Sequence, residues 1–241
     1  MIKIILIILF NIISLSASGK TYSVGVESYI DHPYQSVKAN GEFYGVLKDI
    51  LDSFAKEEGI NFIYKPYKSA ELYKEFLSGN LDFKFPDNYI WKFAEKEGHN
   101  IIYSIIVTHY IDGIFIKKSD LGKKMKEFKI FGTNKGDDIV HILSKKQKDG
   151  RIDVTNAQTC SELISKIMAG EIDAIFCNYD VMRYLLKGSL YEKEVVFNPD
   201  FLFIDNYFYL STIKHKEIIE KFNKWVIKNR QYIERVAHEQ I

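Results

Sequence analysis

The feature of this sequence that most constrains its fold is the alternation of short apolar strands with amphipathic helices. The pattern predicts a strand, helix, strand, helix and strand at residues 22–26, 46–58, 61–64, 70–77 and 81–85. The last strand is expected to be cut at Pro86. This order favours an α/β fold with a mostly parallel sheet and helices on its faces.

The pattern changes near residue 100 and then begins again. A short apolar run and a long strand are expected at 101–106 and 110–117. A second β-α series follows, with strands at 129–133 and 172–177 and helices at 137–146 and 161–169; a strand at 207–212 and helices at 217–228 and 231–239 close the chain. The chain has 241 residues. This exceeds one typical domain of about 100–150 residues, so we expect two lobes.

The first 19 residues have the three parts of a secretory signal peptide. Met1–Lys3 is a short basic start, Ile4–Ile13 is almost wholly apolar, and Ser14–Gly19 is rich in small residues. The apolar run has about ten residues, whereas a membrane-spanning helix needs roughly 20. We therefore expect cleavage after Ala17 or Gly19 and export to the periplasm, with an uncleaved membrane anchor as the alternative.

Charge and cysteine content exclude several classes of protein. The formal net charge is +1, so the chain lacks the basic surface by which proteins bind nucleic acid or anionic membranes. Two cysteines are too few for a disulfide scaffold or a four-cysteine zinc site. Cys160 lies at an expected helix start and Cys177 near the end of the next strand. Two buried thiols are expected, with a disulfide as the alternative, because helix-to-sheet spacing often exceeds the roughly 7 Å limit between α-carbons.

No catalytic or cofactor motif is present. The sequence contains no G-x-S-x-G, H-E-x-x-H, P-loop or G-x-G-x-x-G, and its histidines lack ligand-spaced partners. We therefore expect neither a metal nor a cofactor. Aromatic residues instead stand out at 15% of the chain. Several fall in loops or at strand ends, where open α/β sheets bind ligands and where a ring or cation can stack on them; packing in the core is the alternative for each.

Seven short motifs occur along the chain in the same order as in one known protein family. They are Tyr22–Val26; Pro33-Tyr34; Gly41 with Gly45–Ile50; Pro66-Tyr67 with Leu77–Asp82; Tyr103-Ser104; Lys129–Gly132 with Gly136-Asp137; and Ala169–Ile175. Over about residues 20–238, the chain resembles the family 3 extracellular solute-binding proteins. These are the type II periplasmic binding proteins that serve polar amino acid transporters.

The resemblance implies a two-lobed type II periplasmic binding protein fold with two crossing hinge strands and a ligand in the cleft between the lobes. After a signal peptide at 1–19, the first lobe would comprise 20–112 and 206–241, and the second 113–205. The protein would not be an enzyme. It would be a monomer that captures a small polar ligand and delivers it to an ABC-type transporter permease or a membrane sensor. A periplasmic enzyme on the same fold, similar to cyclohexadienyl dehydratase, is the alternative.

We expect eight residues to face the cleft, because each follows or ends an expected strand or opens a helix. They are Tyr34, Tyr67, Asp87, Asn88, Trp91, Lys92, Asp137 and Asn178. Tyr34 also matches the stacking aromatic residue of the family's Pro-Pro-Phe loop.

Three positions that bind the amino-acid head group in the family differ in this sequence. The Arg that clamps the ligand carboxylate as a fork is absent, with Lys92 the nearest cation. Asp137 stands where the family has a Thr, and Asn178 stands in place of the acidic residue that meets the ligand ammonium, with Asp180 two residues on. We therefore expect a cationic or neutral polar ligand such as an amine. The alternative is an unusual carboxylate held by Lys84 or Lys92.

Overall fold

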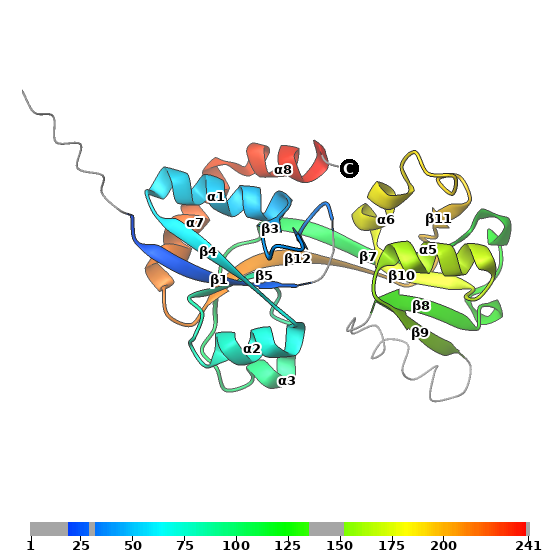
Figure 1. Ribbon diagram of the computed structural model, residues 1–241, viewed down its shortest axis with the longest axis horizontal. Helices are drawn as coiled ribbons and strands as arrows, with labels where there is room; N and C mark the ends of the chain where they lie inside the picture. The colour runs from blue at the N-terminus through cyan, green and yellow to red at the C-terminus, as the bar shows by residue number, and fades with distance from the viewer. Residues whose placement is uncertain (1–18, 29–31, 135–151, 240–241) are drawn as a thin grey trace, which may run out of the picture.

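The structure is a computed structural model that describes residues 19–28, 32–134 and 152–239. These residues form two lobes joined by two long strands. The joining strands are β7 (Thr108–Lys117) and β12 (Phe203–Thr212), which pair antiparallel with each other (Figure 1). The α/β architecture with two lobes expected from the sequence is confirmed. The expected signal peptide at 1–19, apart from its last residue, lies outside the described residues, as do the expected helix at 137–146 and Asp137.

The first lobe is built on three parallel strands. β1 (Thr21–Glu27) lies between β4 (Asn61–Tyr67) and β5 (Phe83–Asp87), and β12 continues the sheet antiparallel to β5. The helices of this lobe are α1 (Val46–Glu58), α2 (Ser69–Leu77), α3 (Phe93–Lys96), α7 (Lys216–Lys228) and α8 (Arg230–Glu239). The short strands β2 (Ser36–Val37), β3 (Phe43–Tyr44) and β6 (Ile102–Tyr103) complete it.

The packing of α1 follows directly from its sequence spacing. Its apolar residues are buried along one face, and Gly59 ends the helix in the left-handed conformation with φ 66°. On that face, the ring of Phe54 packs against two rings of α7. Its centroid lies 5.0 Å from that of Phe222 and 5.9 Å from that of Trp225. Apolar burial at helical period therefore fixes α1 and α7 on the same core.

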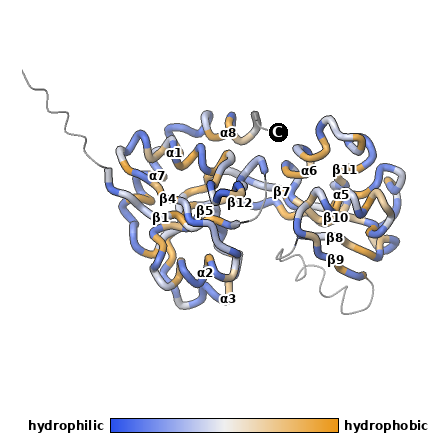
Figure 2. The backbone as a smooth tube through the Cα atoms, viewed as in Figure 1, coloured by the Kyte–Doolittle hydropathy of each residue, from blue (hydrophilic) through white to orange (hydrophobic). Residues whose placement is uncertain are grey.

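The second lobe repeats the parallel arrangement. β8 (Ile130–Asn134) lies between β9 (Asp153–Ala157) and β10 (Ala174–Asn178), and β10 pairs antiparallel with β7. β10 is buried throughout and is coloured as hydrophobic in Figure 2. α5 (Cys160–Ala169), α6 (Tyr179–Leu186) and the short strand β11 (Val195–Phe197) complete the described part of the lobe, with 3-10 turns at Lys118–Asp120 and Met125–Glu127.

Two expectations from the sequence are wrong. Cys160 and Cys177 form a disulfide rather than two buried thiols, because the first residue of α5 packs on the end of β10 and brings the α-carbons to 6.5 Å. The strand expected to be cut at Pro86 continues through it to Asp87. Proline is tolerated there because the pairing of β5 with β1 ends at Lys84, so no N–H is required from Pro86 on that side.

Candidate functional site

The polar strand ends of the two lobes face each other. Figure 1 shows the C-terminal ends of β1 in the first lobe and of β8 in the second lobe directed toward the opposite lobe. In open α/β sheets, ligands bind outside these carboxyl ends. The residues at these two edges are therefore the candidates for ligand contact.

Four charged side chains are buried at the edge of the first lobe, and we call them the strand-end cluster. They are Glu27 at the end of β1, Lys84 and Asp87 on β5, and Lys96 at the end of α3; each is at most 7% exposed. Burying a charge is costly unless it is paired and hydrogen-bonded. The contacts of each member therefore indicate whether it stabilises the lobe or remains available for a ligand.

Asp87 is held entirely by protein groups. Its carboxylate accepts hydrogen bonds from Lys96 Nζ (2.7 Å), the Tyr73 hydroxyl (3.0 Å) and the Ser211 hydroxyl (2.6 Å). Lys84 Nζ lies 3.7 Å from the same carboxylate and donates to the carbonyl of Pro86 at 2.6 Å. The side chain of Asp87 is therefore the centre of a buried ionic network, and it has no exposed surface for a ligand to contact.

Glu27 differs from Asp87 because one of its buried oxygens, Oε2, has no hydrogen-bond partner. Burial raises the pKa of the Glu27 carboxyl above its ordinary value, against the opposing effects of Lys84 and of a hydrogen bond from Ser69. An unpartnered buried carboxylate oxygen is unfavourable by itself. Glu27 is not among the eight residues predicted from the sequence; the available signal was its position at the end of the first strand.

Aromatic side chains connect this edge to the joining strands. Tyr110 of β7 and Phe208 of β12 stack with ring centroids 4.5 Å apart. Tyr34 packs edge-on against Phe208 at 5.3 Å, and Trp91 lies 6.0 Å from the same ring. Lys84 Nζ lies 5.4 Å from the centre of the Trp91 ring, at cation–π distance. Tyr34 and Trp91, both predicted site residues, thus meet on one aromatic platform.

The edge of the second lobe carries one neutral cap, Asn178, and two carboxylates, those of Asp112 and Asp180. Asn178 caps α6 by accepting hydrogen bonds from the backbone N–H groups of Asp180 and Val181, at 3.0 and 3.2 Å. Its Nδ2 also donates to the Asp112 carboxylate at 3.0 Å. The Asp180 carboxylate accepts a hydrogen bond from the Tyr34 hydroxyl of the first lobe. The structure thus brings Tyr34 and Asn178 to neighbouring positions across the two lobes.

The other predicted site residues have separate surroundings. Asn88 is buried and donates to Asn206 and to the carbonyl of Tyr207, both at 2.8 Å. Tyr67, at the end of β4, packs on the apolar cluster of α2. Lys92 precedes α3 in the left-handed conformation with φ 49°, which is uncommon for a residue other than glycine. Whether any of the eight contacts a ligand stays a prediction.

Two surface hollows lie in the described part of the chain; the first is lined by no member of the strand-end cluster, and the second is lined by one of them, Lys96. One, of about 320 Å³, lies between α1 and α8 and is lined by Asp49, Asp52, Ser53, Lys56, Tyr232 and Val236. The other, of about 160 Å³, lies beside α3 and is lined by Tyr89, Phe93, Lys96, Glu97, His99, Ile101 and Tyr103. The strand ends are the better candidate site, because they carry a buried polar atom without a hydrogen-bond partner and neither hollow is lined by one.

The described residues hold no cluster of metal-ligating side chains, and none of their helices is long and apolar enough to cross a membrane.

Comparison with known proteins identifies the fold but matches no sequence family. No protein-family model and no curated protein matches the chain. Solved structures are similar over nearly the whole chain. An ancestral arginine-binding protein bound to arginine is 20% identical with a TM-score of 0.70, covering 92% of this chain and 98% of that one.

Two further solved structures are similar to the same extent. An arginine transport-system periplasmic binding protein from Legionella pneumophila is 13% identical with a TM-score of 0.70, covering 92% of this chain and all of that one. An ancestral amino acid-binding protein, a precursor of cyclohexadienyl dehydratase, is 16% identical with a TM-score of 0.70, covering 91% and 94%. At sequence identities this low, structural similarity establishes the fold and nothing further. This chain has the two-lobed fold of the periplasmic binding proteins.

Proposed function

We propose that this chain is an exported solute-binding protein that captures a small polar ligand between its two lobes and presents it to a membrane transporter or sensor. The lobes would comprise residues 20–112 with 206–241, and 113–205, and the protein would act in the periplasm after removal of its signal peptide. The observation that carries the proposal is the Glu27 carboxylate at the end of β1, buried with an unpartnered oxygen in a fold of binding proteins.

The ligand we propose carries a cationic or neutral donor group, such as an amine. A ligand N–H donating to Glu27 Oε2 would satisfy the buried oxygen and offset the desolvation of the carboxylate. The aromatic ring of Trp91, which is partly exposed, suits a cation or an apolar stem equally well. One of the similar solved structures is an arginine-binding protein bound to arginine, and another is a periplasmic binding protein of an arginine transport system; both are consistent with a cationic ligand.

The contacts of Lys84 argue against a carboxylate ligand held by that residue. Lys84 is fully buried, its Nζ donates to the Pro86 carbonyl, and the ammonium lies beside Asp87 and the ring of Tyr73. A ligand carboxylate would have to displace these contacts. Lys92, which is partly exposed, remains the cation through which a carboxylate ligand would bind if this proposal is wrong.

Calorimetric titration tests the proposed ligand class. The panel contains arginine and putrescine as cationic probes, glutamine as a neutral one and succinate as a dicarboxylate. We expect a cationic or neutral probe to bind, and Glu27→Gln to weaken its binding by about tenfold or more, as expected for the loss of a hydrogen bond to a charged group. Glu42→Gln, on the exposed β2–β3 hairpin, is the matched control.

Two results would contradict the proposal. One is tight binding of succinate that is lost in Lys92→Ala and unchanged in Glu27→Gln. The other is conversion of prephenate or arogenate by the protein, which would favour the enzyme similar to cyclohexadienyl dehydratase. Recovery of the titrated ligand unchanged after incubation supports a binding protein instead.

A further inference from the structure

One loop of the first lobe touches one helix of the second lobe at two points. Tyr34, in the loop between β1 and β2, donates a hydrogen bond to the Asp180 carboxylate on α6. Two residues earlier in the same loop, the His32 ring lies edge-on to the Tyr184 ring, with centroids 4.2 Å apart. Asp180 and Tyr184 are one helical turn apart, so the two contacts lie side by side along α6. Figure 1 shows α6 at the side of the second lobe that faces the first.

Both ends of the hydrogen bond are held in place. Tyr34 is 2% exposed and packs on Phe208, and its hydroxyl also lies 3.4 Å from the carbonyl of His109 on β7. Asp180 is fixed by its backbone N–H, which donates to the Asn178 cap of α6 at 3.0 Å. Preorganised partners lose little conformational entropy when such a bond forms, and a hydrogen bond to a carboxylate is among the stronger kinds.

The second contact is apolar in character. Burial lowers the pKa of the His32 imidazole, so the ring is neutral at neutral pH. Edge-to-face is a favourable arrangement of two rings. Because Tyr184 is 41% exposed, this contact lies at the rim of the molecule, while the Tyr34 hydrogen bond lies inside it.

We infer that Tyr34–Asp180 and His32–Tyr184 form a latch that holds the two lobes together by contacts between protein groups, without any contribution from a ligand. Two-lobed proteins exchange between open and closed arrangements about their joining strands. A contact that is made in one arrangement and lost in the other shifts this equilibrium by its interaction energy. The latch therefore raises the closed population of the ligand-free protein.

The latch would also affect ligand affinity, and this consequence rests on the proposed function. A ligand that binds the closed arrangement has an apparent dissociation constant equal to the intrinsic one divided by the closed fraction. A latched protein therefore binds more tightly than the same site on free lobes, and the ligand is released more slowly. The latch itself depends on the fold and not on which ligand is bound.

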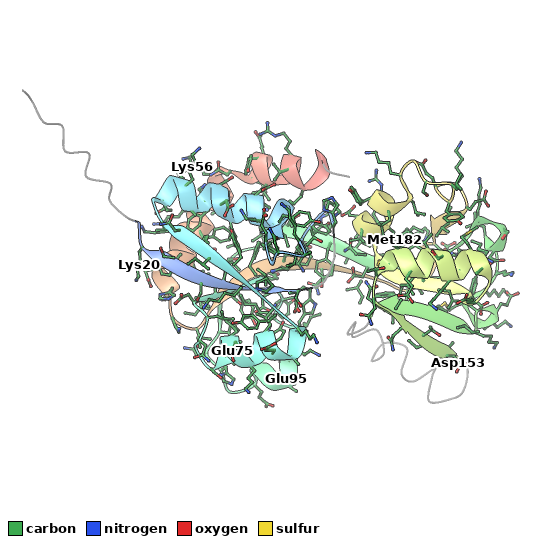
Figure 3. The ribbon with its side chains drawn as sticks, viewed as in Figure 1. Lys20, Lys56, Glu75, Glu95, Asp153 and Met182 are labelled. Atoms are coloured by element: carbon green, nitrogen blue, oxygen red, sulfur yellow. A yellow bond between two sulfur atoms is a disulfide. The ribbon has the colours of Figure 1, made fainter. Side chains whose placement is uncertain are left out.

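Inter-lobe distances in the ligand-free protein test the latch. Spin labels are placed on introduced cysteines at Lys56, on the outer surface of the first lobe (Figure 3), and at exposed Lys193 in the second. The two native cysteines are joined and do not compete for label. Pulsed electron resonance then gives the distance distribution, and small-angle X-ray scattering of unlabelled protein gives the radius of gyration.

Tyr34→Phe removes the hydroxyl and keeps the ring against Phe208. We expect the inter-lobe distances to broaden toward longer values and the radius of gyration to rise. The matched control is Tyr64→Phe, because the Tyr64 hydroxyl donates to the Asp52 carboxylate at 2.6 Å within the first lobe. That variant should leave both readouts unchanged. Asp180→Asn, which keeps an acceptor oxygen, should give an intermediate effect.

The outcomes separate the latch from the proposed function. If Tyr34→Phe and Asp180→Asn are folded by circular dichroism and leave the distances unchanged, the latch is wrong, whatever the titrations show. If the distances lengthen while no probe of the ligand panel binds, the latch stands and the proposed ligand class falls. Equal lengthening in Tyr64→Phe would also overturn the latch, because it would show a nonspecific loosening of the protein.

Discussion

The facing edges of the two lobes are stabilised in different ways. The first lobe buries the ionic strand-end cluster there, with Asp87 between two lysines. The second lobe carries a disulfide between α5 and β10, next to the Asn178 cap of α6. Both lobes are parallel α/β units, yet one relies on desolvated charges and the other on a covalent link. Two similar α/β lobes therefore stabilise the same edge of their sheets by different interactions. We expect the two edges to respond differently to mutation.

The largest expected effect breaks the ionic side of this comparison. Asp87→Asn keeps the shape of the side chain but leaves Lys96 buried without the carboxylate that it contacts, and leaves Lys84 with Glu27 as its nearby carboxylate. Removing one partner of a buried pair costs about 3–5 kcal/mol, and urea unfolding should show a decrease of this size in the free energy of unfolding. Glu42→Gln, which breaks an exposed pair with Lys38, should leave the midpoint nearly unchanged. A loss as small as that of the control would show that the cluster does not stabilise the lobe.

The next effect breaks the covalent side. Cys160→Ser combined with Cys177→Ser removes a link between residues 17 positions apart, for which chain-entropy estimates give about 3 kcal/mol. Urea unfolding measures the loss, and hydrogen exchange locates it. We expect faster exchange in β8 and β10, with β1 and β4 little changed. Faster exchange mainly in β1 and β4 would contradict the assignment of the disulfide to the stability of the second lobe.

The smallest effect has the opposite sign and sharpens the contrast within the strand-end cluster. Glu27→Gln should raise the free energy of unfolding at pH 7, because it removes a desolvated carboxylate. The folded-state pKa of Glu27 lies above its ordinary value of 4.5. The protein with Glu27 therefore loses stability as pH rises from 4.5 through that raised pKa, and remains less stable above it.

The gain from Glu27→Gln should accordingly fall as the pH is lowered and vanish below 4.5, where the carboxyl is protonated in both states. Urea unfolding of both proteins from pH 4 to pH 7 measures it. A constant difference over this range would show that ionisation of Glu27 has no part in the effect. A loss of stability at pH 7 would show that the interaction with Lys84 outweighs the desolvation.

Local sequence patterns predicted most of the fold. α1 was expected at 46–58 and is found there, and the strands β1, β4 and β8 lie within a few residues of their predicted positions. Apolar periodicity is a local property, so it can be read without knowledge of the partner surface. Among the missed elements, α6 begins at Tyr179, directly after β10 ends at Asn178. No loop residue separates the strand from the helix, so no local turn signal marks where α6 begins.

The strand ends were located by sequence, but the roles of their side chains were not. The prediction placed Asp87 and Asn88 toward a ligand because they end a strand; the structure surrounds both with protein donors and acceptors. Glu27 ends a strand equally well and was passed over. Which carboxylate is satisfied depends on residues far along the chain, such as Ser211 for Asp87, and no local pattern contains that information.

The sequence by itself determined the order of strands and helices, the two-lobed α/β class and the edge of the sheet where polar residues gather, because these follow from short-range periodicity and chain order. Only the tertiary structure decided that Cys160 and Cys177 are joined, that Tyr34 reaches Asp180, and that Glu27 alone in its cluster keeps an unpartnered oxygen. These outcomes depend on distances of a few ångströms between segments far apart in sequence. Such distances are set by packing of the whole chain.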